Sequence, residues 1–158
     1  ILIRPVDDAP AASVAAQDQL TQEKPTPRQE VTLSSFLAPV QKKFLALKDA
    51  RQIGKEPLRG FADSVEALGE QQSSFSVQDF FWLAECYESL GARAATLELT
   101  SRCYWQSASA YELAQTLGSI HASELEIANR RQSDLLEKSR VASRMARKVN
   151  DESTTSRN

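Results

Sequence analysis

The residues best suited to chemistry in this sequence are two cysteines, one histidine and several paired carboxylates. Cys86 and Cys103 could form a disulfide, bind zinc or act as redox thiols. A zinc or redox motif needs cysteines at close spacing or a nearby histidine, and these two cysteines have neither. Their spacing therefore does not support metal or redox chemistry.

A disulfide between the two cysteines is also disfavoured. Cys86 lies five residues before Gly91 and Cys103 lies twelve residues after it, on two expected helices that meet near this glycine. At about 1.5 Å per residue, the two thiols are about 10 Å out of register along antiparallel helices. This offset exceeds the reach of a disulfide. We predict buried free thiols.

The remaining polar candidates do not form a catalytic pattern. His121 precedes Glu124 by three residues, which reverses the Glu-x-x-His order of carboxylate-bridged metal bundles, and there is no second copy. Carboxylate pairs such as Glu85 and Glu88 lie on polar faces of expected helices. No phosphate-binding glycine loop or nucleophile elbow is found. We predict a non-enzymatic protein with no catalytic, cofactor-binding or metal-binding residue.

The composition favours an all-α domain. The chain has 158 residues, about the size of one ordinary domain, and 41% of them are hydrophobic. Its five glycines and six prolines are few for a sheet protein, which needs turn residues at every hairpin. No apolar run approaches the roughly 20 residues that cross a bilayer.

The two ends of the chain differ from its middle. We expect residues 1–33 to form a flexible Pro/Ala/Gln-rich linker or tether and residues 150–158 to form a disordered tail. Ile1–Ile3, followed by Arg4 and Pro5, could be the exit end of a removed membrane or signal segment. An arbitrary chain boundary is the other possibility.

Between these ends, residues 34–149 are expected to form a helical domain. Apolar residues at spacings of three and four predict helices at about 35–53, 58–68, 77–90, 92–106 and 108–149. We expect Gly54 to end the first helix in a left-handed cap, Pro57 not to continue that helix, and Gly69 to close the second. Ser76, with Asp79, is expected to cap the third helix.

The segment 77–108 has the spacing of a helical hairpin. It contains the pattern FxxLAxxYxxxG, formed by Phe80, Leu83, Ala84, Tyr87 and Gly91. This pattern resembles the first helix and turn of a tetratricopeptide repeat, which implies two antiparallel helices that meet at Gly91. The second helix departs from the repeat pattern, because the expected small residue falls on Ala95 and not one position later, where Thr96 lies. The sequence also contains no second copy of this unit. A generic helical hairpin accounts for the same residues, with Phe80, Ala84, Tyr87 and Leu97 mostly buried.

The last third of the chain is the most regular. Apolar or small residues alternate threes and fours as in a coiled coil: Ala114, Leu117, His121, Leu125, Ala128, Gln132, Leu135, Ser139, Ala142, Ala146 and Val149. Most of these side chains are small and bury little area each. We therefore expect the helix to pack against its own hairpin or against another subunit. Gly118 is a possible break point in it. The alternative to a boundary at residue 107 is a helix that follows the preceding one with little interruption around Gln106 to Ser109.

The C-terminal segment is also basic. Residues 130–158 carry eight basic and four acidic side chains, whereas residues 34–129 carry eight and twelve. A basic amphipathic helix can bind an acidic protein surface, a membrane surface or a nucleic acid. Alternatively, its cations only complement the helix dipole. The expected partner-binding residues are Leu125, Ala128, Arg131, Leu135, Lys138, Arg140, Ala142, Arg144, Arg147 and Lys148.

The expected function is that of a protein–protein interaction module, a scaffold, adaptor or assembly subunit that uses helical-hairpin and coiled-coil surfaces. It would bind a protein partner or self-associate through the C-terminal helix. One alternative is a membrane-tethered component of a cell-envelope or secretion assembly. The other is a nucleic-acid-binding module that uses the basic helix. We favour a cytoplasmic location, with a periplasmic or envelope-tethered one as the alternative.

Overall fold

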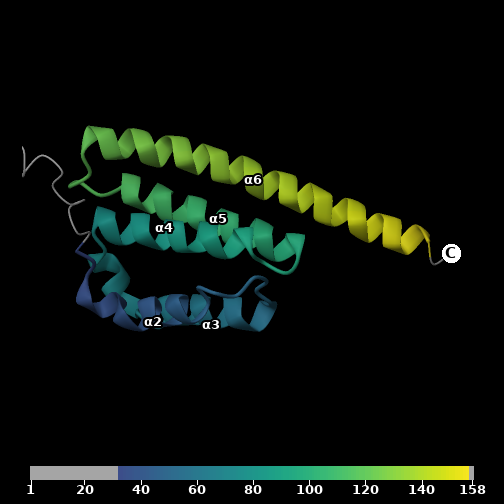
Figure 1. Cartoon of the computed structure of the whole chain (residues 1–158). Helices are drawn as coiled ribbons and strands as arrows, with labels where there is room; N and C mark the ends of the chain where they lie inside the picture. Colours follow the sequence, from purple (N-terminus) through teal and green to yellow (C-terminus); the bar gives the residue numbers. More distant parts are fainter. Residues whose placement is uncertain (1–31, 157–158) are drawn as a thin grey trace, which may run out of the picture. The chain divides into compact units, whose positions relative to one another are not determined.

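The computed structural model describes residues 32–156, so that nearly all of the predicted linker lies outside the described residues. From Leu33 onward these residues belong to one helical unit. Its elements are η1 (Ser35–Leu37), α2 (Ala38–Ala46), α3 (Lys55–Glu66), η2 (Gly69–Ser74), α4 (Val77–Ala92), α5 (Leu97–Gln115) and α6 (Ala122–Thr155). The predicted all-α fold with a long C-terminal helix is confirmed (Figure 1).

A capping box starts α4, as the sequence predicts. The Ser76 hydroxyl accepts a hydrogen bond from the Asp79 N–H at 3.1 Å, and the Asp79 carboxylate accepts one from the Ser76 N–H at 2.9 Å. Asp79 is fully buried and also accepts bonds from the Ser34 N–H at 3.0 Å and the Ser34 hydroxyl at 2.6 Å. One carboxylate therefore joins the start of α4 to the segment before η1.

Asp79 makes the stability of the fold depend on pH. Burial alone would raise the pKa of Asp79, but hydrogen bonds from Ser34 and Ser76 outweigh burial, and the net pKa lies below the ordinary value of 3.8. A carboxylate whose pKa is lowered by folding contributes stability above its unfolded pKa and loses it as the pH falls through its folded pKa. We expect the free energy of unfolding to fall between about pH 5 and pH 2 less steeply in Asp79→Asn than in wild type.

Urea unfolding at a series of pH values measures this difference. Asp63→Asn is the control, because Asp63 is an exposed carboxylate on α3. Equal pH slopes in wild type and Asp79→Asn would contradict the assignment.

Gly91 lies inside α4 and does not end it, so the predicted turn at this residue is wrong. The helix continues to Ala92. A Cβ atom added to Gly91 would lie 2.9 Å from the Cβ of Cys103 and 3.1 Å from the ring of Tyr104. The position is occupied by glycine because α5 approaches the backbone of α4 closely there.

The first predicted helix, at 35–53, is too long, because α2 ends at Ala46. Three carbonyl oxygens of the following loop accept hydrogen bonds from the Arg93 guanidinium at 2.6, 3.0 and 2.8 Å, namely those of Leu47, Lys48 and Ala50. The Ile53 N–H then donates to the Arg93 carbonyl at 2.8 Å. These bonds from the α4–α5 turn hold the loop in a non-helical path.

The predicted roles of the glycines and the proline around α3 are confirmed in part. The prediction for the first glycine is wrong, and that for the second is confirmed. Gly54 is the N-cap of α3, with an extended backbone at φ −81° and ψ 178°, so the predicted left-handed cap is wrong. Pro57 lies in the first turn of α3, where its missing N–H costs little. Gly69 has a positive φ of 54° just after α3, in agreement with its predicted role.

The predicted boundary between helices at residue 107 is wrong, and the alternative of a continuous helix around Gln106 to Ser109 is confirmed. α5 continues to Gln115 because Ser107 packs inside the hairpin, where its hydroxyl donates to the Ala84 carbonyl at 2.6 Å. The chain turns at residues 116–121, around Gly118, which the sequence offers as a second possibility. α5 and α6 therefore form a second helical hairpin.

α6 extends to Thr155, so the predicted disordered tail is wrong for residues 150–155. The hydroxyls of Ser153, Thr154 and Thr155 each donate to the carbonyl four residues earlier. With 34 residues, α6 is about 51 Å long, whereas the 19 residues of α5 span about 28 Å. Figure 1 shows the C-terminal end of α6 running beyond the α4–α5 turn.

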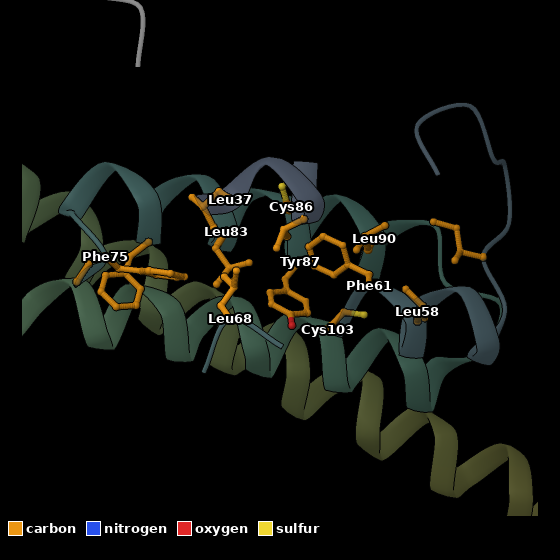
Figure 2. Packing of buried hydrophobic residues seen from close by; sticks show 14 residues of the cluster. Leu37, Leu58, Phe61, Leu68, Phe75, Leu83, Cys86, Tyr87, Leu90 and Cys103 are labelled. Carbon is orange, nitrogen blue, oxygen red and sulfur yellow. The ribbon is translucent and has the colours of Figure 1, made fainter. Parts of the chain in front are cut away.

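The main core brings α2, α3 and α4 together. Phe61 of α3 is fully buried and packs edge-on against Tyr87 of α4, with ring centroids 5.2 Å apart. Figure 2 shows the surrounding apolar cluster, which also contains Cys86 and Cys103. The predicted burial of Phe80, Ala84 and Tyr87 is confirmed. Leu97 is partly exposed but also mostly buried, in agreement with the prediction for that residue.

A second core joins α4, α5 and α6. Its buried members are mostly small: Ala84, Ala108, Ala110, Tyr111, Ala128 and Leu135. Small side chains let the helix backbones approach closely, and each buries little area. Leu135 is the largest apolar side chain that α6 buries here. The predicted seam of the C-terminal helix therefore packs, in this region, against its own chain.

Candidate protein-binding surfaces

The structure divides the predicted partner-binding residues into covered and exposed groups. Ala128, Leu135 and Ala142 are buried within the chain, which corresponds to the first of the two predicted outcomes, packing of the helix against its own hairpin. Their covering helix is α5, because α6 folds back on it. Leu125, from the same predicted seam, is 37% exposed.

A reciprocal serine pair fixes the register of α5 against α6. The Ser101 hydroxyl donates to the Ser139 carbonyl, and the Ser139 hydroxyl donates to the Ser101 carbonyl, each at 2.9 Å. Both hydroxyls thus keep partners at a largely buried contact. This register brings the start of α5 beside the C-terminal half of α6.

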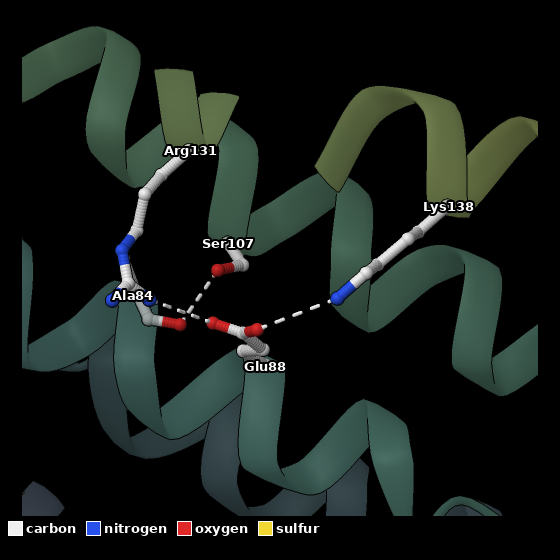
Figure 3. A network of polar contacts seen from close by, with 5 residues as sticks. All are labelled: Ala84, Glu88, Ser107, Arg131 and Lys138. Carbon is white, nitrogen blue, oxygen red and sulfur yellow. Dashed lines mark hydrogen bonds and ion pairs between the residues drawn. The ribbon is translucent and has the colours of Figure 1, made fainter. Parts of the chain in front are cut away.

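Two of the cations that were predicted to bind a partner form ion pairs within the chain. Arg131 and Lys138 of α6 lie 3.5 Å and 3.7 Å from the carboxylate of Glu88 on α4, as Figure 3 shows. The Lys138 ammonium also lies 5.8 Å from the centre of the Tyr104 ring. Glu88 therefore balances part of the basic surface, although exposed pairs of this kind contribute little stability.

The other cations of the predicted surface lie farther along α6. Arg140 and Arg144 contact Glu137 of the same helix at 3.3 Å and 3.9 Å. Within residues 32–156, Arg147 and Lys148 form no ion pair. The C-terminal end of α6 therefore keeps a net basic, solvated surface.

An exposed apolar row, which we call the C-terminal stripe, runs along the same part of α6. It consists of Val141, Met145 and Val149, which are 42%, 51% and 52% exposed. Their spacing of four places them on one side of the helix. Val141 and Met145 also line a shallow groove of about 370 Å³ with Leu97 and Tyr104 of α5. Glu137 and Lys138 line the groove as well, so the stripe and groove form one mainly apolar surface with a charge of each sign beside it.

The two cysteine thiols lie in the apolar core. Cys86 and Cys103 are free and buried, as predicted. Burial raises the pKa of the Cys86 thiol, with a further contribution from Glu85, and raises that of Cys103 to about 11. Neutral buried thiols are poor nucleophiles.

His121 is the N-cap residue of α6, and its backbone N–H donates to the Glu124 carboxylate at 3.0 Å. Glu124 thereby satisfies a free donor at the start of the helix. The described residues contain no group of three or more His, Cys, Asp or Glu side chains that could hold a metal ion.

Among residues 32–156, no helix is both long and apolar enough to span a membrane. No protein-family model, curated protein or solved structure matches the chain. The function is therefore inferred from the surfaces themselves.

Proposed function

We propose that this protein is a non-enzymatic assembly module in which the C-terminal half of α6 pairs with α6 of a second copy. The observation that carries this proposal is the C-terminal stripe, an apolar row left uncovered beside the groove that contains Leu97 and Tyr104. A continuous exposed apolar surface is typical of interaction sites. A second amphipathic helix is the natural occupant of such a row.

The charge pattern favours an antiparallel pair centred on Met145. In that arrangement Val141 faces Val149 of the second copy, so that the whole stripe is covered. Arg140 then lies level with Asn150 of the second copy, one residue from Asp151. A parallel pair would instead align each basic residue with the same residue of the other copy, which is unfavourable. The proposed pair is a short antiparallel coiled coil.

The hairpin formed by α4 and α5 supports this surface as a tetratricopeptide-like scaffold. Ala84 is fully buried, and Gly91 allows α5 to approach α4 closely. Leu97 and Tyr104 of α5 line the groove beside α6. The proposed scaffold role is to hold the stripe in a fixed position rather than on a free helix.

The solution mass of the full chain tests the proposal. Met145→Glu places a charge at the centre of the proposed contact, and we expect it to raise the dissociation constant of self-association at least about tenfold. Leu113→Glu is the matched control, because Leu113 and Met145 are both 51% exposed and Leu113 lies on α5. Sedimentation equilibrium gives both constants. A monomeric wild type, or equal effects of the two variants, would contradict self-pairing.

Charge reversal separates this proposal from polyanion binding. We expect a variant with Arg140, Arg144 and Arg147 all changed to Glu to self-associate more weakly, because Arg140 loses its acidic neighbour on the second copy. The fold should persist, since all three arginines are exposed. Normal assembly combined with a salt-sensitive loss of affinity for DNA, RNA or anionic vesicles would instead support the nucleic-acid or membrane-surface alternative. The alternative of a membrane-tethered component depends on the proposed tether at residues 1–33, which lies almost wholly outside the described residues.

A further inference from the structure

A second surface, remote from the C-terminal stripe in the sequence, lies between α3 and α5. It is a groove of about 430 Å³ whose apolar lining includes Leu58 of α3, Tyr87 of α4 and Leu99 and Cys103 of α5. Leu58, Tyr87 and Cys103 are each at least nine-tenths buried, so they belong to the floor of the groove. Burial raises the pKa of Tyr87, which therefore keeps a neutral hydroxyl. The floor carries no negative charge.

Three exposed cations surround this floor. Lys55 and Arg59 come from one side of α3, and Arg102 comes from α5. No carboxylate lines the groove. Within residues 32–156, none of these three cations forms an ion pair. The groove thus combines uncompensated positive charge at its edge with an apolar interior.

We propose that the α3–α5 groove binds an anionic amphiphile, a single carboxylate joined to an apolar chain of fatty-acid type. The anion contacts the guanidinium groups of Arg59 and Arg102, which suit carboxylate oxygens because they donate in a planar fork. The chain covers Leu58 and Leu99 and gains the favourable transfer of apolar surface out of water. The ligand therefore needs both parts, a negative group and an apolar body.

The size of the groove favours a small molecule over a partner helix. Its volume of about 430 Å³ lies within the range of small-molecule sites, which is about 300–1,000 Å³. A helix is about 10 Å across, so two turns of it occupy roughly 850 Å³ and could not enter this space whole. A small amphiphile can place its chain inside and its charge at the edge.

The probe for this proposal is dodecanoate, used with the full chain below the concentration at which it forms micelles. Isothermal titration calorimetry should show saturable binding of dodecanoate. Dodecyltrimethylammonium, which has the same chain and the opposite charge, and acetate, which lacks the chain, should each bind at least about tenfold more weakly. Equal binding of dodecanoate and dodecyltrimethylammonium, or no saturable binding of dodecanoate, would overturn the proposal.

Two variants assign binding to the groove. The double variant Arg59→Glu, Arg102→Glu should weaken dodecanoate binding at least about tenfold, whereas Lys42→Glu, Lys43→Glu changes the net charge equally on α2 and should leave binding unchanged. Ala62→Phe fills the groove from its exposed edge and should also weaken binding. Circular dichroism melting checks that each variant is folded. Folded groove variants that bind dodecanoate as wild type does would place the ligand elsewhere and overturn the proposal.

Two further arms distinguish other anionic partners. Binding to phosphatidylglycerol vesicles but not to dissolved dodecanoate would indicate a membrane surface, and binding only to a peptide rich in Glu and Leu would indicate a protein partner. Either result overturns the small-ligand proposal. The groove is tested independently of the α6 pair, because Met145→Glu should leave dodecanoate binding unchanged.

Discussion

Leu135→Ala is expected to lower the free energy of unfolding by roughly 2–5 kcal/mol, the range for a buried leucine whose removal leaves a cavity. Leu135 is 2% exposed and is the largest apolar side chain that α6 places in the second core. Its neighbours there are mainly alanines, which cannot move inward far enough to fill the space. The loss should be visible as a lower urea midpoint.

Ile127→Ala is the control for this substitution. Ile127 also lies on α6, but it is 43% exposed and does not belong to either core cluster. We expect its replacement to change the free energy of unfolding by no more than about 0.5 kcal/mol. If both variants lost similar amounts, α6 would not be packed on its own hairpin as described.

Gly91→Ala should destabilise the protein although alanine is the better helix former. The added Cβ would lie 2.9 Å from the Cys103 Cβ, so α5 must shift, and overpacking of this kind costs roughly 1–3 kcal/mol. Gly60→Ala is the matched comparison, because Gly60 lies inside α3 and no atom lies within 4 Å of a Cβ added there. It should stabilise the protein by up to about 1 kcal/mol through helix propensity.

Thermal unfolding of the two alanine variants measures these opposite signs. Because the substitution is identical, differences in intrinsic helix propensity largely cancel. A melting temperature that rises in both variants would show that α4 and α5 are not in close contact at Gly91.

Local sequence patterns predicted the structural features that residues close in the sequence determine. The Ser76–Asp79 capping box was readable because both partners lie within one turn of helix. The apolar spacing of Phe80, Ala84 and Tyr87 likewise identified the buried side of α4. These features depend on neighbouring residues, so the sequence alone contains them.

The wrong predictions concern residues whose partners are distant in the sequence. Arg93 keeps the loop after α2 non-helical by binding carbonyls more than forty residues away. Ser107 remains inside a helix because the Ala84 carbonyl accepts its hydroxyl. Gly91 was predicted to lie in a turn, whereas a glycine is needed at this position because the neighbouring helix packs closely against it. No local pattern shows these tertiary contacts.

The candidate surfaces were predictable to different degrees. The basic residues of α6 and its seam of small residues recur at helical spacing, so the sequence predicted them. The spacing did not decide whether Leu135 would be covered by its own chain. The α3–α5 groove was missed. Arg59 and Arg102 lie on separate helices, and only the fold brings them to one groove.

The proposed α6 pair is tested most directly by disulfide cross-linking of single-cysteine substitutions on the C-terminal stripe. Cys86 and Cys103 are buried and should not react in the folded protein. In an antiparallel pair centred on Met145, Met145→Cys lies opposite itself and should cross-link readily. Val141→Cys lies opposite residue 149 of the second copy, about 12 Å along the helix from its own counterpart. That distance is too long for a disulfide.

We therefore predict that Met145→Cys forms covalent dimers alone, whereas Val141→Cys and Val149→Cys form them only when the two variants are mixed. Leu113→Cys on α5 measures the rate of random collision between copies. Equal dimer formation by all three stripe variants alone would contradict the antiparallel arrangement. Dimer formation no faster than that of Leu113→Cys would contradict pairing through α6.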